Sequence, residues 1–248
     1  MTIRTGIGGW IYEPWRGGTF YPEGLRQADE LQFAARAVGA IEINATFYRL
    51  QKPESFGKWR EAAPPGFVFA LKGSRYVSNR RDLREAGEGV ARFAEQGITE
   101  LGDMLGPILW QLAPTKAFDA EEMAAFFALL PKETGGHPLR HAVEVGHESF
   151  DCPEFLDLAR GANVAVVYLE QDGRARIAER TADFAYLRCK NLRSEEPTGY
   201  SPEDIARIAK LCEDWGRQGD VFAFLINGAK ERAPAAAMAL AERIGGSA

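Results

Sequence analysis

Cysteine and histidine are scarce in this sequence, which contains three of each among 248 residues. The cysteines, Cys152, Cys189 and Cys212, are odd in number and form no Cys-x-x-Cys pair, so neither a disulfide framework nor a zinc site is expected. We predict free thiols that are buried or half-buried. The histidines form no His-x-His or His-Glu-x-x-His motif, which makes a histidine-based metal centre the less favoured hypothesis.

Long hydrophobic runs are missing as well. No stretch of 18 apolar residues occurs, and the opening residues MTIRTGIGGW lack the apolar segment of a secretion signal. We therefore expect a cytoplasmic protein that does not associate with membranes. The net charge of −5 argues against a non-specific nucleic-acid binder, although it is compatible with a local basic pocket.

Strand-like and helix-like segments alternate eight times along the chain, without an internal repeat or a linker. This pattern predicts an α/β fold, a single (β/α)8 TIM barrel over residues 1–248. The segment Glu170 to Thr181 has no helical periodicity, so the helix between strands six and seven is expected to be irregular or missing. A doubly wound open sheet is the main rival, but the first turn lacks the G-x-G-x-x-G fingerprint. The expected strands are Ile3–Gly8, Ala40–Asn44, Phe67–Leu71, Ile108–Leu112, His141–Val145, Val164–Leu169, Phe184–Arg188 and Val221–Ile226.

Three of the expected helices have clear sequence signals. Leu83–Gln96 is expected to form one helix. Asp119 is the expected N-cap of a helix over Ala120–Leu130, and Ser201 is the expected N-cap of a helix that ends at Trp215. The residues that follow Asn44 are expected to form a loop.

The second of these strands opens the stretch AIEINATFYRL, from Ala40 to Leu50. Ile41 and Ile43 alternate with Glu42 and Asn44, so one face of the strand is apolar and the other is polar. In a closed barrel the polar face points at the axis, and groups near the carboxyl end of a strand line the ligand site. The fifth strand repeats this pattern with Glu144.

Polar side chains gather at several predicted strand ends, which identifies a candidate site at the C-terminal end of the barrel. Two acids and two bases are its candidate catalytic residues: Glu42, Lys72, Glu144 and Arg188. Candidate substrate-binding residues are Trp10, Tyr12, Asn44, Tyr48, Gln111, His147 and Asn227. The same charges can also form a structural ion-pair network, and this alternative stays open. A metal bound by Glu42, Glu144 and His147 is a third hypothesis, less favoured because two cations occupy the same mouth.

The motifs GIGGWIYEPW, FYP and EINATFY resemble the YecE-like family, domain of unknown function 72, and later segments follow the same order to about Leu240. The resemblance implies a TIM barrel loosely grouped with sugar isomerases, with no firmly assigned reaction. Family members usually carry E-x-R-H-x-S-W after the fifth strand, whereas this chain has Gly146 and Phe150 at the arginine and tryptophan positions. The usual paired asparagines on the eighth strand are here Ile226 and Asn227.

Three functional hypotheses follow from these residues. The first is an enzyme that acts on a small anionic or sugar-like substrate in a polar pocket at the C-terminal end, without a cofactor. The second is a catalytically silent binding barrel, which the loss of the family arginine at Gly146 favours. The third is a metal-dependent hydrolase or nuclease. A small molecule, and not a nucleic acid, is the expected partner.

Overall fold

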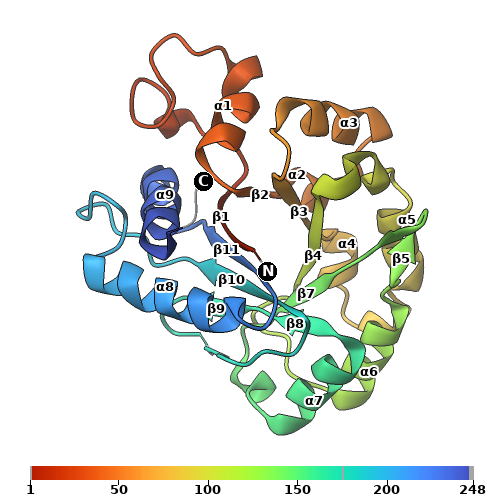
Figure 1. Ribbon diagram of the computed structural model, residues 1–248. Coiled ribbons are helices and arrows are strands. Elements are labelled where there is room, and N and C mark those ends of the chain that lie inside the picture. Colours follow the sequence, from red (N-terminus) through yellow and green to blue (C-terminus); the bar gives the residue numbers. More distant parts are fainter. Residues whose placement is uncertain (1, 175, 246–248) are drawn as a thin grey trace.

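Eight parallel strand positions form a ring with helices on its outside, which confirms the predicted barrel (Figure 1). The computed structural model describes residues 2–174 and 176–245. The strands pair in the order β8-β7-β4-β3-β2-β1-β11-β10-β9. They are β1 (Ile3–Gly8), β2 (Ala40–Ile43), β3 (Val68–Lys72), β4 (Leu105–Gln111), β7 (His141–Glu144), β8 (Val164–Val166), β9 (Tyr168–Glu170), β10 (Phe184–Cys189) and β11 (Asp220–Leu225).

The sixth strand position is shared by β8 and β9, which a single residue, Val167, separates. β8 pairs with β7 on one side, and β9 pairs with β10 on the other. The Val167 amide still donates to the Val143 carbonyl at 3.0 Å, so the chain runs on from one pairing to the next. The predicted strand Val164–Leu169 is therefore interrupted, and this interrupted strand closes the ring.

Helices follow most of the strands and cover the outer face of the barrel. After β9, the described residues up to β10 contain no helix, which agrees with the irregular segment expected there. The helices are α1 (Glu30–Ala37), α2 (Ala45–Tyr48), α3 (Pro53–Ala62), α4 (Arg75–Ser78), α5 (Gly87–Ala94), α6 (Ala120–Leu129), α7 (Pro153–Ala162), α8 (Pro202–Gly216) and α9 (Ala233–Ile244).

Two separate apolar clusters arise from the alternation of side chains along the strands. Ile41, Ile43 and their counterparts pack outward against the helices in the larger cluster. The smaller cluster fills the barrel interior and includes Ala40, Val68, Phe222 and Phe224. Because successive strand side chains point to opposite faces, Glu42 lies on the inner side between Ile41 and Ile43.

A close approach between β1 and β2 explains a glycine at the start of this arrangement. A Cβ atom on Gly6 would lie 2.3 Å from the Ala40 carbonyl oxygen, which is far inside a normal contact. Only glycine therefore permits the observed pairing of Gly6 with Ala40.

Helix boundaries follow local capping chemistry in two predicted cases. The Asp119 carboxylate accepts a hydrogen bond from the Glu122 amide at the start of α6, and Ser201 Oγ accepts from the Asp204 amide at the start of α8. The predicted helix over Leu83–Gln96 is wrong as a single element. It divides into a 3-10 turn, Leu83–Glu85, and the helix α5. The N–H of Leu83 donates a hydrogen bond to the Glu122 carboxylate.

Two further segments differ from the sequence-based expectations. Residues after Asn44, expected to form a loop, wind into the short helix α2. A small antiparallel hairpin, β5 (Glu133–Thr134) with β6 (His137–Pro138), precedes β7 and was not expected. Its turn contains Gly135 and Gly136, both with positive φ.

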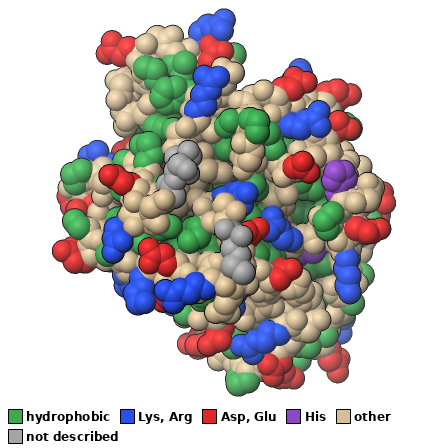
Figure 2. Space-filling model, in the orientation of Figure 1, with side chains coloured by type: hydrophobic (Ala, Val, Ile, Leu, Met, Phe, Trp, Pro, Cys, Tyr) green, Lys and Arg blue, Asp and Glu red, His purple; other side chains and the backbone are tan. Residues whose placement is uncertain are grey.

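Charged side chains of both signs are mixed over the face shown in Figure 2, with no large area of a single sign. In the part of the chain that the structure describes, no helix is both long and apolar enough to span a lipid bilayer. The three cysteines are free thiols: Cys189 and Cys212 are buried, and Cys152 is partly exposed.

Candidate functional site

Six polar side chains meet inside the barrel and form what we call the buried ionic cluster. It consists of Glu42, Gln111, Glu144, Tyr186, Arg188 and Lys190. Arg188 lies between the two carboxylates: one terminal nitrogen donates to Glu42 Oε1 at 2.9 Å, and the other donates to Glu144 Oε2. The guanidinium thereby connects β10 with β2 and β7 across the barrel.

All four carboxylate oxygens of this cluster have a donor. Tyr186 donates its hydroxyl proton to Glu42 Oε2 at 2.8 Å. Glu144 Oε1 accepts from Lys190 Nζ at 2.7 Å and from Gln111 Nε2 at 2.7 Å. A buried charge is costly unless it is paired and hydrogen-bonded, and both carboxylates meet that condition.

The pKa values follow from this arrangement. Burial alone would raise the pKa of Glu144, but the positive charges of Arg188 and Lys190 outweigh it and lower that pKa to about 2. Burial and the neighbouring carboxylate of Glu42 raise the pKa of Tyr186 well above its ordinary value. Glu144 is therefore ionised at neutral pH, and Tyr186 keeps its proton.

Lys72 lies beside the cluster at the end of β3 but is not paired in the same way. Among the described residues no carboxylate forms an ion pair with its ammonium group, which instead lies 4.3 Å from the centre of the Phe47 ring. Burial, followed by repulsion from Arg188, lowers the pKa of Lys72 to about 8. Thr46 Oγ donates to the Lys72 carbonyl oxygen at 2.8 Å and fixes the backbone at this point.

The charges of this region do not cancel. Lys72, Arg188 and Lys190 carry three positive charges, whereas Glu42 and Glu144 carry two negative ones, which leaves one positive charge. Arg188 Nε is also buried without a hydrogen-bond partner. The end of the barrel therefore has a surplus of positive charge and of donors.

Sequence reasoning missed Tyr186 and Lys190. Both lie on β10 or directly after it, at positions two before and two after Arg188. They share its face because strand side chains alternate with a period of two. The rule that placed Glu42 inside the barrel would also have identified these two residues.

The remaining candidate residues lie around the cluster or apart from it. Trp10 packs edge-on against Trp59, with ring centres 5.7 Å apart, and Tyr12 packs against Trp15.

His147 Nδ1 accepts the Ser149 amide hydrogen in a 3-10 turn. Asn227 is exposed, Asn44 approaches Gly8, and Tyr48 is 59% exposed. No hydrogen bond of the described cluster involves any of these side chains.

Gly146, where the family pattern has arginine, lies close to an arginine from elsewhere in the chain, Arg174. A Cβ atom at Gly146 would lie 3.9 Å from Cδ of Arg174, which follows β9. A guanidinium-bearing side chain thus lies next to the position that lacks one.

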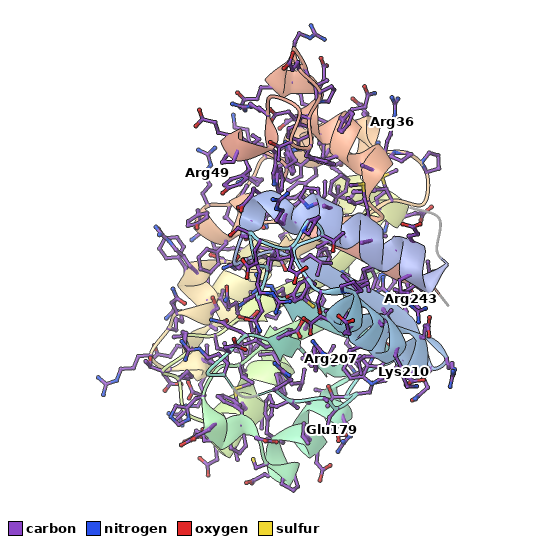
Figure 3. All side chains as sticks on the ribbon, turned by 90° about the vertical axis from the view of Figure 1, so that its left-hand side faces the viewer. Arg36, Arg49, Glu179, Arg207, Lys210 and Arg243 are labelled. Carbon is purple, nitrogen blue, oxygen red and sulfur yellow. The ribbon has the colours of Figure 1, made fainter. Side chains whose placement is uncertain are left out.

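Another buried carboxylate, Glu170 at the end of β9, lies outside the barrel interior. It pairs with Arg207 of α8, which is labelled in Figure 3. Because Glu170 pairs in register with Cys189, one position beyond Arg188, it points to the helix layer and not to the axis. It contributes to the attachment of α8 and not to the buried ionic cluster.

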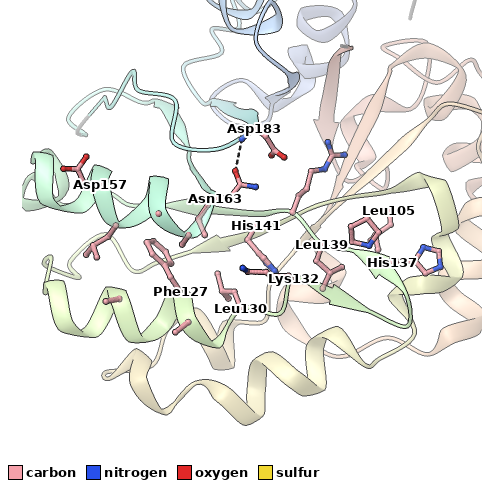
Figure 4. Close-up of a pocket in the computed structure, with 18 of the residues that line it drawn as sticks. Leu105, Phe127, Leu130, Lys132, His137, Leu139, His141, Asp157, Asn163 and Asp183 are labelled. Carbon is pink, nitrogen blue, oxygen red and sulfur yellow. Dashed lines mark hydrogen bonds between the residues drawn. The ribbon is translucent and has the colours of Figure 1, made fainter.

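A large groove lies at the opposite end of the strands (Figure 4). Its volume is about 1010 Å³, and residues of α6, α7 and the start of β7 line it. Two of its polar side chains already have partners: His141 accepts from Trp110 and bonds to the Pro131 carbonyl, and Asn163 accepts the Asp183 amide hydrogen. In TIM barrels, catalytic groups lie at the carboxyl ends of the strands, so the cluster is the stronger candidate site.

Comparison with known proteins places this chain in a family. The model for "protein of unknown function DUF72" matches residues 4–248. UPF0759 protein YecE of Escherichia coli K12 is 31% identical over 120 residues, which are 48% of this chain and 42% of YecE. The matched segment thus spans less than half of that relative.

Solved structures show the same fold. A DUF72 family protein of Thermotoga maritima MSB8 is 23% identical, with 99% of this chain and 100% of that chain covered and a TM-score of 0.80. D-psicose 3-epimerase of Clostridium cellulolyticum H10, solved with D-tagatose, is 14% identical, with 98% of each chain covered and a TM-score of 0.58. Because the family model covers nearly the whole sequence, this chain belongs to the DUF72 family of proteins of unknown function.

Proposed function

We propose that this protein is an enzyme that binds a small anionic or sugar-like substrate at the C-terminal end of its barrel. The observation that carries the proposal is the unpaired positive charge of Lys72 beside a cluster whose two carboxylates are already neutralised. A phosphate, sulfate or carboxylate group would complete this charge balance.

Each residue of the site has its own role in this proposal. Lys72 binds the anionic or carbonyl oxygen of the substrate and exchanges a proton with it, because its pKa of about 8 lies near neutral pH. Glu42, Glu144 and Arg188 fix the electrostatic field around that proton. Gln111 and Lys190 orient Glu144 through Oε1.

Because D-psicose 3-epimerase was solved with D-tagatose, we include sugars among the first compounds to be tested. The fold alone is shared with that enzyme, so sugars are included as probes and not as an assigned activity. A silent binding barrel is the second candidate, favoured by the glycine at position 146.

Calorimetric titration and thermal melting with phosphate, sulfate and sugar phosphates at millimolar concentration test binding. We expect modest affinity in the native protein and a loss of about 10-fold or more in Lys72→Met, because a hydrogen bond to a charged group is worth about 1.5–3 kcal/mol. Lys210→Met, which removes a 74% exposed lysine from α8, is the matched control. No heat and no thermal shift in the native protein with any of these anions would contradict the proposal.

Turnover separates the two candidates. Incubation of the native protein and Lys72→Met with sugar phosphates and sugar acids, followed by NMR of the products, should show conversion only with the native protein. Binding that depends on Lys72 without any conversion would favour the silent barrel.

A further inference from the structure

Exposed apolar side chains are concentrated at the end of the barrel that carries Lys72. Of the five large hydrophobic residues that are exposed in the described part of the chain, four lie in the segments that follow β1, β2 and β3. They are Ile11, Tyr48, Leu50 and Tyr76, and the fifth is Met238 on α9. Exposed apolar groups gathered at one place mark an interaction site more often than scattered ones do.

Tyr48 and Tyr76 belong to a continuous series of aromatic and cationic side chains, which we call the rim ladder: Lys72, Phe47, Tyr48, Arg75 and Tyr76. The Lys72 ammonium lies 4.3 Å from the Phe47 ring centre, and the Phe47 and Tyr48 rings are 5.2 Å apart. The Arg75 guanidinium lies 5.9 Å from the Tyr48 ring centre and 5.3 Å from that of Tyr76. The ladder thus leads from the barrel end to two rings that are 59% and 65% exposed.

The segments that follow β2 and β3 are strongly basic. Residues 45–53 and 72–81 contain no Asp or Glu, whereas the whole chain has a net charge of −5. Their Lys and Arg residues are Arg49, Lys52, Lys72, Arg75, Arg80 and Arg81. One of them, Arg80, pairs with Glu85 at 3.6 Å. A ligand that lies on the rim ladder therefore meets positive charge along its length.

We infer that the rim ladder binds the base of a nucleoside phosphate whose phosphate group lies at Lys72. This inference rests on the proposed anion site and names its substrate class. Flat bases stack on aromatic rings and on guanidinium planes, and both kinds of surface are exposed here. A bare phosphate or a sugar phosphate would leave the two tyrosines unused.

Three probes separate the parts of this ligand: adenosine 5′-monophosphate, ribose 5-phosphate and adenosine. In titrations of the native protein we expect the nucleotide to bind about 10-fold more tightly than ribose 5-phosphate, the gain typical of one stacked base. Adenosine should bind more weakly than the nucleotide because it lacks the phosphate. In Lys72→Met, the nucleotide should lose this phosphate-dependent advantage over adenosine.

The double variant Tyr48→Ala/Tyr76→Ala should bind the nucleotide no more tightly than ribose 5-phosphate, whose own affinity should not change. Tyr48→Phe/Tyr76→Phe keeps both rings and should restore the difference, and Met238→Ala is a control for removal of an exposed apolar side chain elsewhere. Thermal melting of each variant shows that it is folded. Equal native affinities for the nucleotide and ribose 5-phosphate would overturn the inference but leave the anion site standing. No binding of either compound would overturn the inference, and the absence of binding by inorganic phosphate and sulfate as well would overturn the anion site too.

Discussion

Arg188 donates a hydrogen bond of 2.9 Å to Glu42, a residue 146 positions earlier in the sequence. The same guanidinium pairs with Glu144, so one buried cation bridges two buried carboxylates. We therefore expect the removal of Arg188 to destabilise the folded barrel, whether or not a ligand is bound.

We expect Arg188→Met to lower the free energy of unfolding by about 3–5 kcal/mol, the usual cost of leaving buried charges without a partner. Urea denaturation measures this change. Arg26→Met is the control, because it removes an arginine whose side chain is 79% exposed and whose pairing with Asp29 should be worth less than about 1 kcal/mol.

A second variant separates unpaired charge from lost packing. Glu42→Gln/Arg188→Met removes the guanidinium together with the carboxylate that has no other cationic partner among the described residues, leaves Glu144 paired with Lys190, and should be more stable than Arg188→Met alone. If the double variant is the less stable of the two, an uncompensated carboxylate is not the cause of the loss.

Anion affinity should decrease as the pH rises through about 8. Lys72 is charged below its pKa of about 8 and neutral above it, so a site that needs this charge binds best at lower pH. For sulfate, whose charge is constant in this range, we expect about a 10-fold weaker affinity at pH 9 than at pH 7. Lys72→Arg should bind sulfate equally well at both pH values, and an equally flat profile in the native protein would contradict the role of Lys72.

Divalent metal ions should not stabilise the native protein. Each oxygen of Glu42 and Glu144 already accepts a hydrogen bond, so a metal ion must displace Arg188, Tyr186, Lys190 or Gln111 to bind there. We expect less than about 1 °C change in melting temperature with Mg²⁺ or Mn²⁺ at concentrations far above typical dissociation constants. A shift of several degrees that disappears in Glu42→Gln would revive the metal hypothesis.

Acid should destabilise the fold through His141. Its ring uses both nitrogens, since Nδ1 accepts from Trp110 and Nε2 donates to the Pro131 carbonyl oxygen, and burial lowers its pKa. The unfolded chain therefore binds a proton more readily, and the free energy of unfolding should decrease as the pH falls below about 6.5.

The variant His141→Gln should be less stable than the native protein near pH 7.5 but should lose less stability between pH 7.5 and pH 5.5. Urea denaturation at the two pH values measures this difference. Parallel losses in the two proteins would show that other groups cause the acid sensitivity.

The fold was predictable because its signals are local. Alternation identified Glu42 as an inward side chain, and Asp119 and Ser201 marked the starts of two helices. The break at Val167 was not predictable, because it depends on how two neighbouring strands pair across the ring and not on the local run of apolar residues. The split of Leu83–Gln96 likewise depends on the distant Glu122.

The residues of the buried ionic cluster were predictable in part, but its charge balance was not. Glu42, Glu144 and Arg188 were identified from strand ends, and the structure shows that they touch. With two acids and two bases the sequence left the net charge at zero. Lys190, overlooked two positions after Arg188, pairs with Glu144 and makes the difference.

The large sequence separation between Glu42 and Arg188 also sets when the buried ionic cluster can form during synthesis. The ribosome completes β2 and β7 before β10, so the two carboxylates exist in the nascent chain before the guanidinium that bridges them. Contacts between residues so distant in sequence form late, because the intervening chain must first be ordered. The centre of the barrel can therefore reach its final arrangement only when the last quarter of the polypeptide has emerged.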